Sequence, residues 1–170
     1  KGDEAVYQIM HEDKPHNNSG GDKVGAEVHI MLYHIASNDF VDSTTFIDMK
    51  VYNRGQNSFN DFKVAFYLDP DIGSFEDDYI GSAPAKNMIY AYNGPNFDSG
   101  QNGAPGYQSN PPAIGIVSLN RGTQYSGYFN RSDLGTPDND DPSTPADYWN
   151  YMNGKWKNGA DWVNGGTGFP

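Results

Sequence analysis

Val24-Gly25-Ala26-Glu27-Val28-His29-Ile30-Met31-Leu32 is the stretch that decides the fold class of this chain. Apolar residues stand at every second position from Val24 to Leu32, with Gly25, Glu27 and His29 among the residues between them. Alternation with a period of two is typical of a β-strand that buries one face and exposes the other. The sequence therefore predicts a strand over residues 24–32 and a fold built on sheets.

Two further runs alternate in the same way and predict a hairpin. Residues 47–52 and residues 62–68 each place apolar side chains on one face, and the polar cluster at 53–57 between them is typical of a turn. Shorter strands are predicted over three other segments: 88–92, 114–119 and 123–129. Short strands separated by Gly, Pro, Asn and Asp indicate an all-β fold, which we expect to be an antiparallel β-sandwich of jelly-roll type.

Long loops and one short helix complete the predicted fold. The 20 glycines and 11 prolines supply many turns, and the longest loops are expected at 93–112 and 131–143. A C-terminal helix is predicted near 145–156, because Thr144 can cap its first turn and Asp147 can bond back to the cap.

Composition excludes several classes of function. The chain has 22 acidic and 11 basic side chains and a net charge of −11, which disfavours nucleic acid and anionic membranes as partners. No apolar run approaches the ~20 residues needed for membrane insertion. The absence of cysteine excludes disulfides, thiolate metal sites and cysteine nucleophiles. We expect a single domain over 1–170, as a piece of a larger multidomain protein.

The densest group of carboxylates directly follows the strand predicted at 62–68. Four of them share one loop as candidate metal ligands: Asp69, Asp71, Asp77 and Asp78. Calcium takes about six to eight oxygen ligands, and a loop that bends at Gly73 can wrap them around the ion. The loop is not an EF-hand, because Ile80 stands where that motif has its bidentate Glu. A solvated acidic turn explains the same residues without a metal.

A second acidic cluster precedes the predicted helix. In it Asp138 and Asp140 are candidate ligands for a second calcium ion. A solvated loop with an Asp-Pro turn at Asp141-Pro142 is the favoured alternative. The four histidines do not stand at the spacing of a metal site.

Aromatic residues in loops are the remaining candidate site. Phe97, Tyr107 and Trp162 could stack on sugar rings, although aromatic residues more often pack a core. No sequence motif of a serine hydrolase, a nucleotide-binding loop or a zinc protease is present. A glycosidase needs only two suitably spaced carboxylates, so a glycan-active hydrolase stays a further alternative.

Several short motifs follow one another in a recognisable order along most of the chain: Val24-Gly25-Ala26-Glu27-Val28-His29, Leu68-Asp69-Pro70-Asp71-Ile72-Gly73, Asp77-Asp78-Tyr79-Ile80-Gly81, Tyr92-Asn93-Gly94, Pro111-Pro112-Ala113-Ile114-Gly115 and Ala146-Asp147-Tyr148-Trp149. This series resembles β-rich ectodomain segments of large Bacteroidetes proteins that leave the cell through the type IX secretion system. The resemblance implies a secreted or cell-surface location, supports the four loop carboxylates as metal ligands, and implies no catalytic activity.

The function predicted from the sequence is a non-catalytic structural or adhesive module, extracellular or on the cell surface, whose acidic loop is stabilised by calcium. Its expected partners are other domains of the same surface protein, and a glycan or protein ligand. A carbohydrate-binding module that uses loop aromatics is the alternative.

Overall fold

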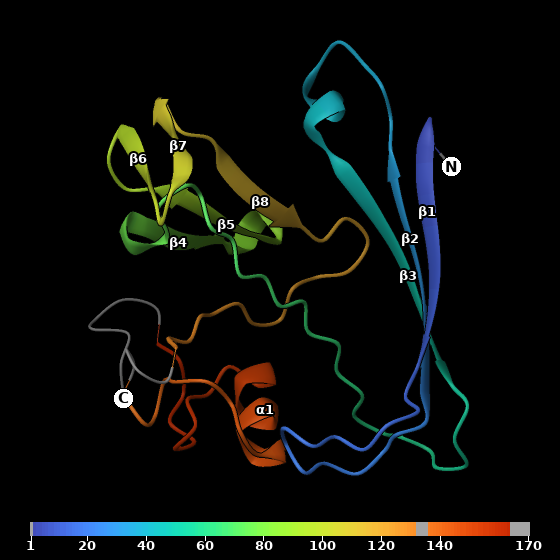
Figure 1. Ribbon diagram of the computed structural model, residues 1–170. Coiled ribbons are helices and arrows are strands. Elements are labelled where there is room, and N and C mark those ends of the chain that lie inside the picture. The colour runs from blue at the N-terminus through green and yellow to red at the C-terminus, as the bar shows by residue number, and fades with distance from the viewer. Residues whose placement is uncertain (1, 132–135, 164–170) are drawn as a thin grey trace. The chain divides into compact units, whose positions relative to one another are not determined.

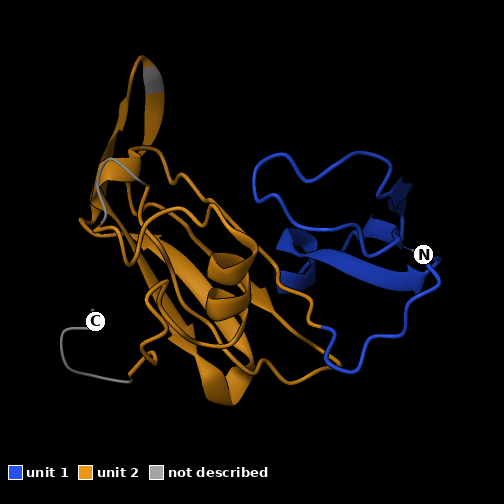
Figure 2. Ribbon diagram, turned by 90° about the horizontal axis from the view of Figure 1, so that it is seen from below, with its two compact units in different colours: residues 1–62 blue, residues 63–170 orange. Residues whose placement is uncertain are grey.

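The computed structural model describes residues 2–131 and 136–163. They form mostly strands in three antiparallel sheets, with one short α-helix (Figure 1). The β-rich class is therefore confirmed, while the sandwich arrangement stays a prediction. The chain divides into two compact units, unit 1 over residues 1–62 and unit 2 over residues 63–170 (Figure 2).

Unit 1 is a three-stranded antiparallel sheet in the order β1-β2-β3. Its strands are β1 (Glu4–His11), β2 (Ala26–His34) and β3 (Thr45–Asn53), and a 3-10 turn (Phe40–Ser43) precedes β3. The strand predicted over 24–32 is confirmed as β2. It begins at Ala26 because Gly25 is left-handed, with φ +72°, and because a carboxylate oxygen of Glu12 accepts the Gly25 N–H at 2.5 Å.

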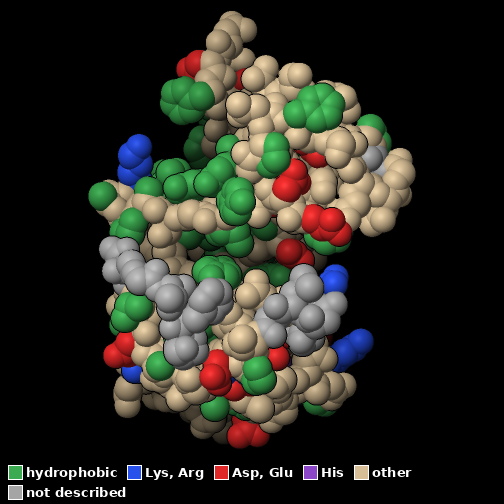
Figure 3. Space-filling view, turned by 90° about the vertical axis from the view of Figure 1, so that its left-hand side faces the viewer, with side chains coloured by type: hydrophobic (Ala, Val, Ile, Leu, Met, Phe, Trp, Pro, Cys, Tyr) green, Lys and Arg blue, Asp and Glu red, His purple; other side chains and the backbone are tan. Residues whose placement is uncertain are grey.

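One face of the unit 1 sheet is apolar and open. The register places Val6 opposite Leu32, and Leu32 opposite Ile47. Val6 and Ile47 are nevertheless 63% and 46% exposed, and no hydrophobic side chain of unit 1 is buried within the described residues. Large hydrophobic side chains also reach the surface elsewhere, as the face drawn in Figure 3 shows. The alternation therefore predicted the strand and its apolar face correctly, but the apolar side chains on that face are not buried as expected.

The predicted hairpin of 47–52 with 62–68 is wrong. Residues 62–68 form no strand, and Phe62 and Phe66 are each 51% exposed. The Tyr67 ring stacks instead on Phe129, with 5.5 Å between the ring centroids. Alternation specifies which side chains share a face, but it does not specify which strand supplies the backbone partners.

Unit 2 contains a three-stranded sheet, a hairpin and the helix. The sheet has the order β4-β5-β8 and the hairpin pairs β6 with β7. The bounds are β4 (Asp78–Ala83), β5 (Met88–Asn93), β6 (Phe97–Gln101), β7 (Ala104–Ser109) and β8 (Ala113–Val117), with 3-10 turns at Phe75–Asp77 and Pro84–Lys86. The strands predicted at 88–92 and 114–119 are confirmed as β5 and β8.

Two other predictions for unit 2 are wrong. Residues 123–129 form no strand, and the loop expected at 93–112 contains β6 and β7. These two strands contain Gly, Asp, Pro and Ala, which are depleted in strands, so contacts beyond local preference must stabilise the hairpin. Its register shifts between Asp98 and Gly100.

The predicted helix is confirmed as α1 (Pro145–Met152), with the expected capping box. Thr144 Oγ1 accepts the Asp147 N–H at 3.2 Å, and Asp147 Oδ2 accepts the Thr144 N–H at 2.9 Å. The helix ends before 156 because Gly154 adopts φ +69°. No helix within the described ranges is long and apolar enough to cross a membrane.

Five aromatic residues of unit 2 form a cluster around the segment that follows α1. Trp156 is only 4% exposed and its ring meets those of Tyr128 and Trp162, with centroids 6.2 and 5.8 Å away. Trp162 also lies 6.2 Å from Tyr151, which stacks on Phe129 at 5.4 Å. These ring contacts make Trp156 and its neighbours the aromatic core of unit 2.

Candidate metal centre

The acidic loop ends where β4 pairs with β5. Asp78 stands opposite Asn93 in the register, and the Gly94 N–H donates to the Asp77 carbonyl at 2.8 Å. Asp78 and Asn93 therefore form a non-hydrogen-bonded pair, in which facing side chains share one side of the sheet with Cβ atoms about 4.5–5.5 Å apart. The register thus joins the acidic loop to a residue that lies distant in the sequence.

Three side-chain oxygens at this junction are buried and have no hydrogen-bond partner: Asp77 Oδ1, Asp78 Oδ1 and Asn93 Oδ1. Asn93 is only 6% exposed. Its Nδ2 donates to the Pro95 carbonyl at 2.8 Å, which fixes the amide and leaves Oδ1 without a donor. A buried polar atom left unsatisfied costs about 1–3 kcal/mol. The three oxygens at the junction therefore lack hydrogen-bond donors or a positive charge to compensate for their burial.

The electrostatics of Asp78 point the same way. Burial raises the pKa of its carboxyl above the ordinary value, and the neighbouring carboxylates of Asp77, Asp71 and Asp98 raise it further. The Ile72 N–H, which donates to Asp78 Oδ2 at 2.8 Å, acts in the opposite direction. Within residues 2–131 and 136–163, no Lys or Arg forms an ion pair with Asp71, Asp77 or Asp78.

Asp98 fastens the loop to the β6–β7 hairpin. Its side chain is fully buried and accepts the backbone N–H groups of Tyr107 at 2.7 Å, Gly100 at 2.9 Å and Ser74 at 3.0 Å. The bonds from Tyr107 and Gly100 are the main cause of its lowered pKa. A carboxylate satisfied by three donors is a structural anchor, and its charge adds to the negative field at Asp78.

The donor set at the junction fits calcium. Two carboxylates and an amide oxygen are hard ligands of the kind that calcium prefers, and carbonyls and water can complete its coordination. No group of three Asp, Glu or His side chains in the described part of the chain forms a ready metal site. Any ion here would therefore depend on Asn93 and on backbone or water oxygens.

The structure treats the four predicted loop ligands differently. Asp77 and Asp78 lie at the junction, and Asp71 lies close enough to affect the pKa of Asp78. Asp69 is exposed, and its carboxylate bonds with the Tyr67 hydroxyl. Asp69 is therefore the member that the structure does not bring to the junction.

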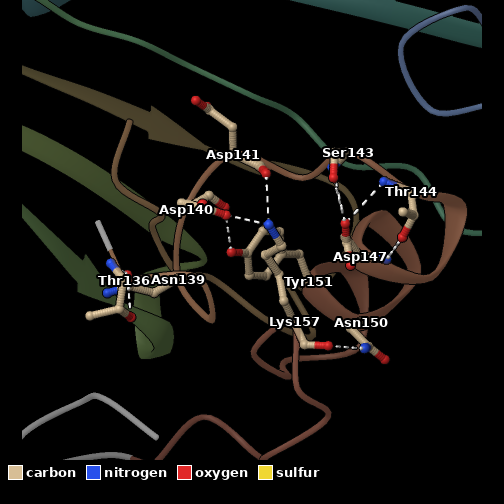
Figure 4. A network of polar contacts seen from close by, with 10 residues as sticks. All are labelled: Thr136, Asn139, Asp140, Asp141, Ser143, Thr144, Asp147, Asn150, Tyr151 and Lys157. Atoms are coloured by element: carbon tan, nitrogen blue, oxygen red, sulfur yellow. Dashed lines mark hydrogen bonds and ion pairs between the residues drawn. The ribbon is translucent and has the colours of Figure 1, made fainter. Parts of the chain in front are cut away.

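The second acidic cluster has a cation of its own (Figure 4). Lys157 Nζ forms an ion pair with Asp140 and donates to the Asp141 carbonyl at 3.1 Å. The Asp138 carbonyl accepts the Lys157 N–H at 3.0 Å, and the Tyr151 hydroxyl donates to the Asp140 carbonyl at 2.7 Å. A second calcium ion at Asp138 and Asp140 stays a prediction, and it would have to displace Lys157.

The three predicted sugar-binding aromatics do not form one platform. Phe97 and Tyr107 lie on the β6–β7 hairpin and are 52% and 57% exposed. Trp162 packs in the aromatic cluster with Tyr151 and Trp156. No ring contact joins the hairpin pair to Trp162 among the residues that the structure describes.

Sequence reasoning missed Asn93 and Asp98, although both fall in the long loop expected at 93–112. Asn93 directly follows the strand predicted at 88–92, and Asp98 lies further along the same expected loop. What neither pattern could show is that both side chains meet the acidic loop. In comparisons with protein-family models, curated proteins and solved structures, nothing matches this chain.

Proposed function

We propose that the chain is a non-catalytic structural or adhesive module of a bacterial cell-surface or secreted protein, and that calcium bound at Asp77, Asp78 and Asn93 stabilises unit 2. The observation that carries the calcium site is the set of three buried oxygens without partners. A divalent cation at the junction would supply the positive charge that these oxygens lack and would offset the carboxylate charge around Asp78. Asp71 acts electrostatically on Asp78 and is the further candidate ligand.

Two features support the structural part of the proposal. The motif series that resembles type IX secreted proteins supports a secreted or surface location. The apolar face of the unit 1 sheet, where Val6 is 63% exposed, is the kind of surface through which domains associate. The partner of this face would be another domain of the same protein. We also propose that the sheets of the chain are arranged as a sandwich.

Calcium should raise the thermal midpoint of the chain. At a free concentration of about 100 times its dissociation constant, a ligand of the folded state adds about 2.7 kcal/mol. For a chain of 170 residues this corresponds to a rise of about 5–10 °C. Differential scanning calorimetry with calcium and with chelator measures the effect.

The matched pair Asp78→Asn and Glu76→Gln separates the site from the general charge of the loop. Both variants remove one negative charge, but Glu76 is exposed and is not among the carboxylates that raise the pKa of Asp78. We expect D78N to abolish the response to calcium and E76Q to retain it. An unchanged midpoint for wild type with calcium, or equal responses of the two variants, would contradict the site.

The calcium response should also depend on pH. Because the pKa of Asp78 is raised in the folded state, folding without metal takes up a proton, and stability falls as pH rises from about 4 through that pKa. Calcium binds the ionised form, so its stabilising effect should grow over the same range. Calorimetry of wild type against D78N, at pH 4 to 7 with and without chelator, isolates this group. A calcium effect that is constant with pH would count against Asp78 as a ligand.

A further inference from the structure

A pocket of about 600 Å³ lies beside helix α1 in unit 2. Its lining combines aromatic and polar residues: Tyr125, Trp149 and Trp162 with Asn150, Asn153, Lys155 and Asp161. Tyr125 and Trp149 are 53% and 43% exposed, and Lys63 Nζ lies over one face of the Trp149 ring, 5.6 Å from its centroid. Ring surface for a ligand is therefore left on Tyr125 and on the other face of Trp149. Pockets of this size, with aromatic walls and a few polar groups, are the usual form of a small-molecule site.

Local bonds hold the pocket in shape without a ligand. Lys155 and Asp161 form an antiparallel bridge through their backbones, and Lys155 Nζ lies 2.5 Å from Asp161 Oδ1. The Tyr125 ring lies directly against Gly154, where a Cβ would be only 2.3 Å from the ring. The pocket is thus largely preorganised, which lowers the entropic cost of binding.

The polar groups of the pocket include both donors and acceptors, and the indole Nε1 of Trp162 is a buried donor without a hydrogen-bond partner in the described part of the chain. Asn153 Nδ2 donates to the Trp149 carbonyl at 2.7 Å, and Asn150 Nδ2 donates to the Lys157 carbonyl at 3.1 Å. These bonds fix both amides, and no hydrogen bond within the described residues uses either Oδ1. Together with Trp162 Nε1, these two amide oxygens suit a ligand that both donates and accepts hydrogen bonds.

We propose that this pocket binds a neutral sugar unit of a glycan. A pyranose has an apolar C–H face that packs on aromatic rings such as Trp149 and Tyr125. Its hydroxyl groups can donate to the amide oxygens and can accept from Trp162 Nε1. A phosphate or an acidic sugar fits less well, because Lys155 is already paired with Asp161 and the chain carries a net charge of −11. The pocket shares no residue with the calcium site, so the two proposals stand or fall separately.

Isothermal titration of the full chain against a defined panel tests the proposal. The panel contains soluble hexasaccharides of glucose, mannose, xylose, galactose and N-acetylglucosamine. We expect at least one of them to bind, and Trp149→Ala to weaken its binding about tenfold or more. Asn153→Ala removes one acceptor and should weaken the same sugar, which keeps the test valid if one variant folds poorly.

Tyr148→Ala is the matched control, because Tyr148 precedes Trp149 on the helix, is 40% exposed and does not line the pocket. We expect Y148A to bind the sugar as wild type does. The proposal is overturned if no sugar of the panel binds at 10 mM, if W149A and Y148A bind equally, or if inorganic phosphate or choline binds in place of every sugar.

Discussion

Replacing Gly73 with alanine should destabilise unit 2 by at least ~3 kcal/mol, because two costs combine at this position. Gly73 has φ +71°, and an added Cβ would lie 1.6 Å from Asp98 Oδ2. The left-handed backbone alone costs about 1–2 kcal/mol for a residue with a side chain. Asp98 cannot retreat, since it is fully buried and held by three backbone N–H groups.

The loop that G73A displaces carries Asp77 and Asp78, so this variant should also lose its response to calcium. Gly103→Ala is the matched control. Gly103 is left-handed as well, with φ +83°, but nothing lies within 4 Å of its added Cβ, so only the backbone cost of about 1–2 kcal/mol applies. Urea unfolding followed by circular dichroism measures both variants. Equal losses for G73A and G103A would show that Asp98 does not clamp the loop.

Replacing Trp156 with alanine should cost about 3–5 kcal/mol, the range for removing a large buried aromatic side chain. Trp156 is 4% exposed, and its ring meets those of Tyr128 and Trp162. Its backbone N–H, which donates to the Ala160 carbonyl at 2.8 Å, is kept in the variant. The loss would therefore come from the cavity and the ring contacts.

Trp149→Ala provides the comparison for W156A, because it makes the same chemical change at a residue that is 43% exposed. We expect W149A to lower the free energy of unfolding by less than ~1 kcal/mol. Thermal or urea unfolding of the two variants decides the matter. If they unfold alike, the aromatic cluster around Trp156 is not the core of unit 2.

The elements that could be predicted are those made by neighbouring residues. Strand β2 follows from the alternation in 24–32, and β5 and β8 lie within a few residues of their predicted bounds. Helix α1 begins as predicted because Thr144 and Asp147 form a reciprocal cap within one turn. Such contacts are short in sequence, so the pattern of residue types is enough to specify them.

The strand predictions that were wrong concern segments whose structure depends on a partner distant in the sequence. Residues 62–68 alternate as well as β2 does, yet they form no strand, and Tyr67 packs on Phe129 instead. The β6–β7 hairpin has little strand propensity, yet it forms around the carboxylate of Asp98. Pairing and anchoring across long stretches of chain override local preference.

The candidate site also has features that the sequence predicts and features that only the tertiary structure reveals. The sequence by itself determined that this is a strand-rich, strongly acidic chain with a carboxylate-dense loop and a capped helix near its end. Only the tertiary structure decided that Asn93 faces Asp78, that Asp98 fastens the loop, and that Lys157 neutralises Asp140. The physical reason is that register and burial arise from contacts between residues far apart in the chain, and residue types alone do not encode which of these contacts form.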